Sequence, residues 1–368
     1  PGSGPVVIDS SELMFKGEYG RSGPDLVITG SDGQRFVVVG FFSSPNPPAL
    51  ISGDGGVLSG DLVAKLAGPR FSGQFAQAAP AAGATPVGQV EAIGGVVSAR
   101  RADGTAVVLQ MGTAIYQGDV IETGVGANVN IAFVDRTILT LSESARMVVD
   151  RYVFSPAASN NASLFNLVQG TFVFLAGQIA PTGDMRIETP VATMGIRGTT
   201  GVVEVAANNG ATNYTLVPDP DGRTGQFDVF NKATGQLLFS ATRANESLLV
   251  RTAAGDFQQT VKLPDQLVTQ QQAIGLAFSV FNNVQARVQS GQPVVAPTNT
   301  GTPAPPGAAP GAVPGAAPGT TPGTAPTTPP PATPGTTPET APGGTAPAAP
   351  TEQRGGEAPA PDQTQTAQ

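Results

Sequence analysis

The side chains that most often carry out chemistry in proteins are scarce in this sequence. Its 368 residues include no histidine and no cysteine. Ser–His–Asp catalysis, Cys–His catalysis and the usual zinc sites are therefore excluded, because each needs an imidazole or a thiolate. Carboxylates remain, but no spacing requires Asp184, Glu188 and Glu204 to meet. We therefore predict that the protein has no catalytic residue. A glycan hydrolase that uses two carboxylates is kept as the least favoured of three functional hypotheses.

Two acidic turns resemble fragments of calcium loops. Residues 53–56 read Gly-Asp-Gly-Gly, and residues 219–222 read Asp-Pro-Asp-Gly. Neither has the complete ligand pattern, and the proline in the second favours an ordinary turn. The glycines at 124 and 126 do not make a phosphate loop, because no lysine follows them. We therefore predict no metal site and no cofactor.

The most informative stretch runs from Thr189 to Thr199. Its apolar residues Met194 and Ile196 alternate with Gly195 and Arg197, as expected for a strand in a crowded part of the fold. Pro190 suits the entry to a strand, because proline cannot donate to a ladder. Gly195 and Gly198 suit a close approach of two backbones. We expect a side chain at Gly198 to clash with its surroundings and to lower stability.

Arg197 is the charged residue within this stretch. It could bind a carboxylate on a partner. We expect instead that it pairs with Glu188 or Glu204 on a neighbouring strand, because opposite charges on adjacent strands often pair.

Several ordered motifs resemble those of FecR-type domains. The stretch from 189 to 199 matches T-P-x-A-x-x-G-I-R-G-T, residues 118–124 look like G-D-x-I-x-T-G, and residues 167–172 resemble L-x-x-G-x-[FW]. Where the family usually has Asp-Gly-Ser/Thr, this chain has Asp135-Arg136-Thr137, which leaves the type of turn open. The resemblance covers about residues 87 to 255.

The FecR resemblance implies structural roles for the residues of these motifs. They are Gly118, Asp119, Thr123, Gly124, Gly170, Thr189, Pro190, Gly195, Arg197, Gly198 and Thr199. It also implies a compact β-roll or a short β-solenoid.

The hydrophobic pattern independently indicates an all-β domain over residues 87–263. Apolar residues recur with a period of two, as at Val129, Ile131 and Phe133, and turn residues separate the runs. Residues 264–290 change to a helical period and predict one amphipathic helix. We expect its apolar stripe to seal the end of the β domain; self-association through residues 265–289 is the alternative.

The two ends of the chain differ from this domain. Residues 5–78 predict a small module with a β-hairpin, formed by residues 25–29 and 35–40, and a short helix at 59–68 that Gly68 closes. Residues 79–86 have the composition of a linker, and residues 291–368, rich in Pro, Ala, Gly and Thr, predict a disordered tail.

Charge and hydropathy limit the partners. The net charge of −8 argues against nucleic acid, whose binding relies on clustered lysine and arginine. No run of 18 apolar residues predicts a membrane span, and no targeting segment is visible. We expect a protein partner of unknown identity.

The main functional hypothesis is a non-enzymatic binding or scaffold module at the bacterial cell envelope or surface. The FecR resemblance also implies an alternative, a periplasmic component that passes a signal from an outer-membrane receptor to a sigma factor. Either role places the chain in the cell envelope or outside the cell.

Overall fold

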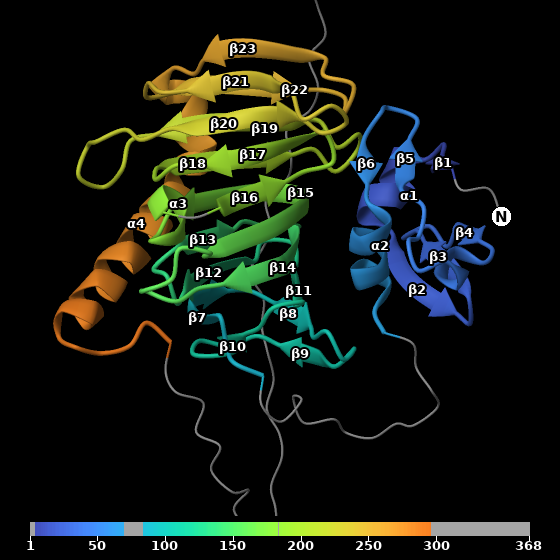
Figure 1. Cartoon of the computed structure of the whole chain (residues 1–368), viewed down its shortest axis with the longest axis horizontal. Helices are drawn as coiled ribbons and strands as arrows, with labels where there is room; N and C mark the ends of the chain where they lie inside the picture. The colour runs from blue at the N-terminus through green and yellow to red at the C-terminus, as the bar shows by residue number, and fades with distance from the viewer. Residues whose placement is uncertain (1–3, 70–83, 183, 296–368) are drawn as a thin grey trace, which may run out of the picture. The chain divides into compact units, whose positions relative to one another are not determined.

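The computed structural model describes residues 4–69, 84–182 and 184–295. Strands dominate these residues and a long helix lies near their end, as Figure 1 shows. The predicted β-rich class and C-terminal helix are confirmed. The predicted linker lies partly, and the predicted tail mostly, outside the described residues.

Two sheets enclose the main core, and their strands pair antiparallel except for the parallel pair β15–β16. Sheet I has the order β9 (Ala106–Val108), β8 (Val97–Arg100), β11 (Val120–Thr123), β14 (Arg146–Val153), β15 (Ala162–Leu175), β16 (Asp184–Glu188), β17 (Ala192–Ile196), β20 (Phe227–Asn231) and β21 (Leu237–Ala241). Sheet II has the order β10 (Ala114–Ile115), β7 (Gly88–Gly94), β12 (Asn128–Phe133), β13 (Ile138–Leu141), β15, β18 (Thr200–Val205), β19 (Thr212–Val217), β22 (Glu246–Val250) and β23 (Phe257–Val261).

Strand β15 belongs to both sheets. Its first part pairs with β14 and β16 in sheet I, and its second part pairs with β13 and β18 in sheet II. Gly170 lies where the strand changes sheets, with a φ of +103° that favours glycine. An added Cβ there would also press on the backbone of Ala145.

The alternation of side chains explains the core. Val129, Ile131 and Phe133 point from β12 into the space between the sheets, as predicted, and Met147 and Val149 meet them from β14. Successive side chains of a strand face opposite ways, so each sheet also has an outer face that something else must cover or leave to water.

Helix α4 (Val268–Gln289), which follows the 3₁₀ turn η2 (Pro264–Leu267), covers the outer face of sheet II. Its buried positions include Ala273, Ala277 and Val284, which share an apolar cluster with Val173 and Val202 of the sheet. The expectation that the apolar stripe packs against the β domain is confirmed, but the helix lies across a face of the sheet and not at the end of the domain. Of the predicted stripe, Val284 is fully buried, while the larger Ile274, Phe278 and Phe281 are only partly buried against the same cluster.

The N-terminal module contains β1 (Val6–Ile8), α1 (Ser11–Lys16), β2 (Glu18–Ser22), β3 (Asp25–Thr29), β4 (Arg35–Val38), η1 (Phe41–Ser43), β5 (Leu50–Ser52), β6 (Val57–Leu58) and α2 (Gly60–Ala67). Strands β3 and β4 form the predicted hairpin. Helix α2 begins after Ser59, whose hydroxyl accepts from Leu62 N, and ends at Gly68 with a φ of +76°, as predicted. Helix α1 and β2 were not predicted.

The module covers part of the outer face of sheet I. Val120, Val148 and Val168 point away from the main core and pack in one apolar cluster with Phe15 and Leu66 of the module. The remaining short helix, α3 (Ile179–Thr182), connects β15 with β16.

Candidate functional site

The turn that joins β16 to β17 carries Thr189 and Pro190. The Thr189 hydroxyl accepts from the amide of Ala192 at 3.2 Å and shares a hydrogen bond of 2.6 Å with the hydroxyl of the buried Tyr214. The carbonyl of Pro190 accepts from the amide of Val57 in the module at 2.8 Å. The turn thus connects the interior of the domain to the N-terminal module.

Lys232, which directly follows β20, holds the same turn. Its Nζ donates to the Thr189 carbonyl at 2.6 Å and lies 3.6 Å from Glu188. Burial lowers the pKa of Lys232, and Glu188 partly offsets that effect. Sequence reasoning missed this lysine, which belongs to no motif.

A groove of 390 Å³ opens on the outer face of sheet I over β16, β17 and β20. Gly195 lies at its centre, opposite Arg186 on one neighbouring strand and Asp228 on the other. Arg197 Nε donates to Asp228 at 3.0 Å, and Arg186 Nε donates to Asp184 at 2.7 Å. The signature residues Gly195 and Arg197 therefore shape an open, polar surface.

The partner expected for Arg197 was wrong. Arg197 pairs with Asp228, 31 positions along the chain, and not with Glu188 or Glu204. Hydrogen bonds from Ser240, Gln226 and Arg197 lower the pKa of Asp228 although its burial acts in the opposite direction. Glu204 lies in the other sheet.

The acids considered for catalysis do not converge. Glu204 accepts from Lys262 at 2.6 Å and from Gln270 of α4 at 2.5 Å, and so ties the helix to sheet II. Asp184 and Glu188 lie on sheet I and are each paired with a cation. Within residues 4–69, 84–182 and 184–295, no three potential ligands of the His, Cys, Asp or Glu type gather to hold a metal ion.

Gly198 and Thr199 form the end of the signature. Gly198 has a φ of +84°, and nothing lies within 4 Å of where its Cβ would be. The expected clash at Gly198 is therefore wrong, although the backbone conformation still favours glycine. The crowded position is Gly225, whose Cβ would collide with the carbonyl of Gly198 and whose amide donates to the Thr199 hydroxyl at 3.3 Å.

The earlier motif places Asp119 in a buried corner. One carboxylate oxygen accepts from the amide of Tyr116 at 2.8 Å and from the guanidinium of Arg101. The other oxygen is buried, with no hydrogen-bond partner among the described residues. Burial raises the pKa of Asp119 to about 6, against the opposing effects of Tyr116 and Arg101.

The other residues of that motif shape a turn or make hydrogen bonds with main-chain atoms. Gly118 has a φ of +89°, and Gly124 donates its amide to the Val96 carbonyl at 2.9 Å. The Thr123 hydroxyl donates to the Ser142 carbonyl at 2.6 Å and accepts from the Ala145 amide at 2.8 Å.

Arg136 stands where the FecR family usually has glycine, and its backbone keeps a conformation that favours glycine. Arg136 adopts a φ of +71°, the conformation that glycine would take most easily. The neighbouring carboxylate of Asp135 is fully buried and accepts from Thr137 N at 2.9 Å, Tyr152 OH at 2.5 Å and Ile179 N at 3.1 Å. These hydrogen bonds hold the turn in place although its central residue is strained.

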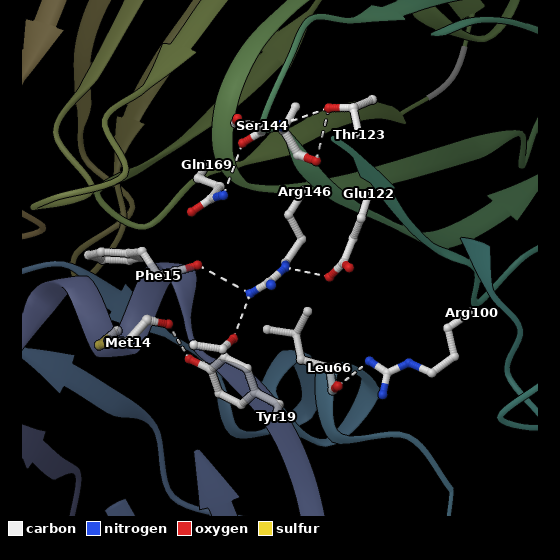
Figure 2. A network of polar contacts seen from close by, with 12 residues as sticks. Met14, Phe15, Tyr19, Leu66, Arg100, Glu122, Thr123, Ser144, Arg146 and Gln169 are labelled. Atoms are coloured by element: carbon white, nitrogen blue, oxygen red, sulfur yellow. Dashed lines mark hydrogen bonds and ion pairs between the residues drawn. The ribbon is translucent and has the colours of Figure 1, made fainter. Parts of the chain in front are cut away.

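Arg146 joins the FecR-like strands to the module. Figure 2 shows its side chain between Glu122 and α1. Nε donates to Glu122 at 2.6 Å, and Nη1 donates to the carbonyls of Phe15 at 3.2 Å and Gly17 at 3.0 Å. These carbonyls lie at the C-terminal end of α1, where helices carry partial negative charge.

A second arginine meets the second helix of the module in the same way. Arg100 donates to the Leu66 carbonyl in the last turn of α2 (Figure 2). Lys65 of this helix pairs with Asp150 of β14 at 2.5 Å. The sequence gives one hint of the role of Arg146, because a charged residue at the start of a long apolar strand needs a partner.

The comparison with protein families agrees with the motifs. The family described as FecR protein matches residues 119–218. Two crystal structures of a protein from Parabacteroides distasonis, described provisionally as an anti-sigma factor, are each 14% identical, with a TM-score of 0.33 and coverage of 42% of this chain and 64% of theirs. A LolA superfamily protein from Nitrosomonas europaea is 10% identical, with a TM-score of 0.10 and coverage of 50% of this chain and 89% of its own.

The chain thus spans 64% of the length of the Parabacteroides protein. No curated protein matched. Among the described helices, none is long and apolar enough to cross a membrane. The family match includes Asp119 and the whole run from Thr189 to Thr199. Residues 119–218 of this chain form a FecR domain.

Proposed function

We propose that this chain is a non-enzymatic regulatory protein of the bacterial cell envelope, which passes a signal from an outer-membrane receptor toward a sigma factor. The observation that carries the proposal is the FecR match over residues 119–218, because sensors of this signalling route belong to the FecR family. The match favours this alternative over a surface scaffold. A fold alone does not fix a function, so the site must supply the rest of the argument.

The contacts of the signature turn support a regulatory role. Pro190 accepts a hydrogen bond from Val57 of the module, and Lys232 and Tyr214 hold the adjoining Thr189 from the domain. A displacement of the module would therefore act directly on the turn at the edge of the groove. Such a contact gives a signal received at one part of the protein a route to another.

For the fold, we propose that the FecR domain is a short β-roll or β-solenoid. The alternation of successive strands between the two sheets supports this proposal. After β16 and β17 in sheet I, the chain forms β18 and β19 in sheet II and then returns with β20 and β21. We also propose the following divisions of the chain: an N-terminal module (5–78), a linker (79–86), the β domain (87–263), an amphipathic helix (264–290) and a disordered tail (291–368).

The test is genetic and uses the source organism. The gene would be deleted, and transcripts would be measured with and without the outer-membrane receptor's inducer. We expect the sigma-factor regulon to lose its response to the inducer and to recover it when the full chain is restored. An unchanged response would refute the signalling role.

Localisation is tested separately with a tagged full chain and cell fractionation. We expect the protein in the periplasmic or membrane fraction. Recovery in the cytoplasmic fraction alone would refute an envelope role. Recovery on the outer surface would instead favour the scaffold hypothesis, which the Pro- and Thr-rich sequence of residues 291–368 suggests.

A further inference from the structure

We propose that the groove over Gly195 binds an extended acidic segment of a partner protein, and that one partner carboxylate lies between Arg186 and Arg197. This inference rests on the proposed function only in assuming that the partner is a protein. The pairing of strands places the two arginines around the glycine. Arg186 lies directly opposite Gly195, and Arg197 follows it two positions later on the same face.

Among the described residues, both guanidinium groups are bound through one nitrogen only. Arg186 and Arg197 use Nε to bind Asp184 and Asp228, at 2.7 Å and 3.0 Å. Their Nη atoms donate no hydrogen bond to another described residue, and the side chains are 53% and 67% exposed. An arginine oriented in this way presents a pair of parallel donors, which is the geometry that a carboxylate accepts best.

The shape of the groove adds an apolar contact beside this charged one. Gly195 provides a floor without a side chain, and Phe230 lies next to it, 3.4 Å from where a Cβ would be. Phe230 pairs across the strands with Leu237, whose side chain is 51% exposed. Residues alternate along an extended peptide, so an acidic side chain and an apolar side chain two positions apart would lie on the same face.

The local charge is opposite to that of the whole chain. The sequence has 27 acidic and 19 basic residues. Around the groove the basic side chains outnumber the acidic ones: Arg151, Arg186, Arg197 and Lys232 face Asp184, Glu188 and Asp228. An acidic partner would be repelled by much of this surface and attracted to this part of it, and this difference gives specificity.

The position of the groove leaves it open to a partner. The module covers sheet I at β11, β14 and the first part of β15, where Val120, Val148 and Val168 are buried beneath it. The groove lies on the next strands of the same sheet, and its opening is lined by the partly exposed Arg186 and Arg197. A partner bound there would lie beside the signature turn that contacts Val57.

The test uses the purified full chain and an array of immobilised octapeptides in which Asp or Glu alternates with each of the other residues. We expect peptides with an acidic residue two positions from an apolar one to be retained. The best peptide, measured by calorimetry, should bind about tenfold more weakly to Arg197→Gln and to Arg186→Gln. The control is Arg223→Gln, which removes the same charge from an 85% exposed side chain outside the groove.

A second pair of variants tests the floor. Gly195→Ala adds only a Cβ, which meets Phe230 at an ordinary distance, and should leave binding unchanged. Gly195→Leu should fill the groove and abolish binding, with thermal melting to verify that the variant is folded. If Gly195→Leu does not fold, the two arginine variants decide the question.

Three results would overturn the inference. They are an array without enrichment of acidic peptides, binding that Arg186→Gln and Arg197→Gln leave unchanged, and dimerisation of the chain that these variants abolish while Arg223→Gln does not. The last result would identify a second copy as the occupant. None of these assays needs a sigma factor, so failure here is distinguishable from failure of the signalling proposal.

Discussion

Replacement of Arg146 by methionine should loosen the N-terminal module while leaving the FecR domain folded. The Arg146 side chain is 10% exposed and makes its hydrogen bonds to Glu122 and to two carbonyls at the end of α1. Methionine matches the apolar stem of arginine and lacks the guanidinium group, so the stem keeps its packing. The change therefore removes mainly the charge and its hydrogen bonds.

The expected magnitude follows from these contacts. Hydrogen bonds to a charged group contribute about 1.5–3 kcal/mol each, but Glu122 is 44% exposed and water screens its pairing with Arg146. The carbonyls of Phe15 and Gly17 lose a cationic donor at the end of a helix. We expect the free energy of docking to fall by about 2–4 kcal/mol, or roughly 30- to 1,000-fold in the open population.

Hydrogen exchange of the full chain followed by mass spectrometry measures this effect region by region. Amides of α1 and β2 should exchange faster in Arg146→Met, while those of β12 and β13, in the main core, should keep their protection. Arg223→Met, at an exposed position far along the chain, is the control.

Two outcomes would refute the reasoning about Arg146. Unchanged exchange in α1 and β2 would show that the apolar cluster under Phe15 holds the module without the arginine. Faster exchange throughout the chain would show that Arg146 stabilises the FecR domain itself.

Three further predictions concern stability, measured by urea denaturation. Arg136→Gly should stabilise the protein by about 0.5–1 kcal/mol, because it relieves a φ of +71° at the cost of chain entropy, and a loss of stability would contradict this. Gly225→Ala should cost about 3 kcal/mol and Gly198→Ala about 1, because only the first collides with backbone; the reverse order would be inconsistent with the geometry. The pKa of Asp119 is about 6 in the folded protein against 3.8, so its contribution to stability is complete below pH 3.8 and is lost as pH rises through 6. The free energy of unfolding of Asp119→Asn, relative to that of the native protein, should therefore be higher at pH 7 than at pH 3.5, and the opposite trend would refute a raised pKa.

The sequence predicted the strands and helices of this fold better than it predicted which of them pack against one another. Alternation located strands such as β12 because one face of each strand must be apolar whatever covers it. It could not say that α4 covers the other face, nor that Val148 packs against the module and not in the main core. The periodicity of apolar residues shows which residues share a face of a strand or helix. Which element covers that face depends on distant parts of the chain.

The candidate site shows the same limit. The motifs located Gly195 and Arg197, but the partner Asp228 lies on β20, which pairs with β17 only because the chain forms two strands of the other sheet in between. Local pairing rules favour nearby acids, and they failed here for that reason. Arg146 was missed because its main partners are carbonyls, which no side-chain pattern reveals.

Strand β15 touches both coverings of the domain within 14 residues. Val168 lies under the module, and Val173 and Leu175 lie under α4, with Gly170 between them. A pull or a shift applied at one covering is thus transmitted along a single covalent segment to the other. The N-terminal module and α4 are therefore coupled through the backbone of one strand, although they lie on different sheets.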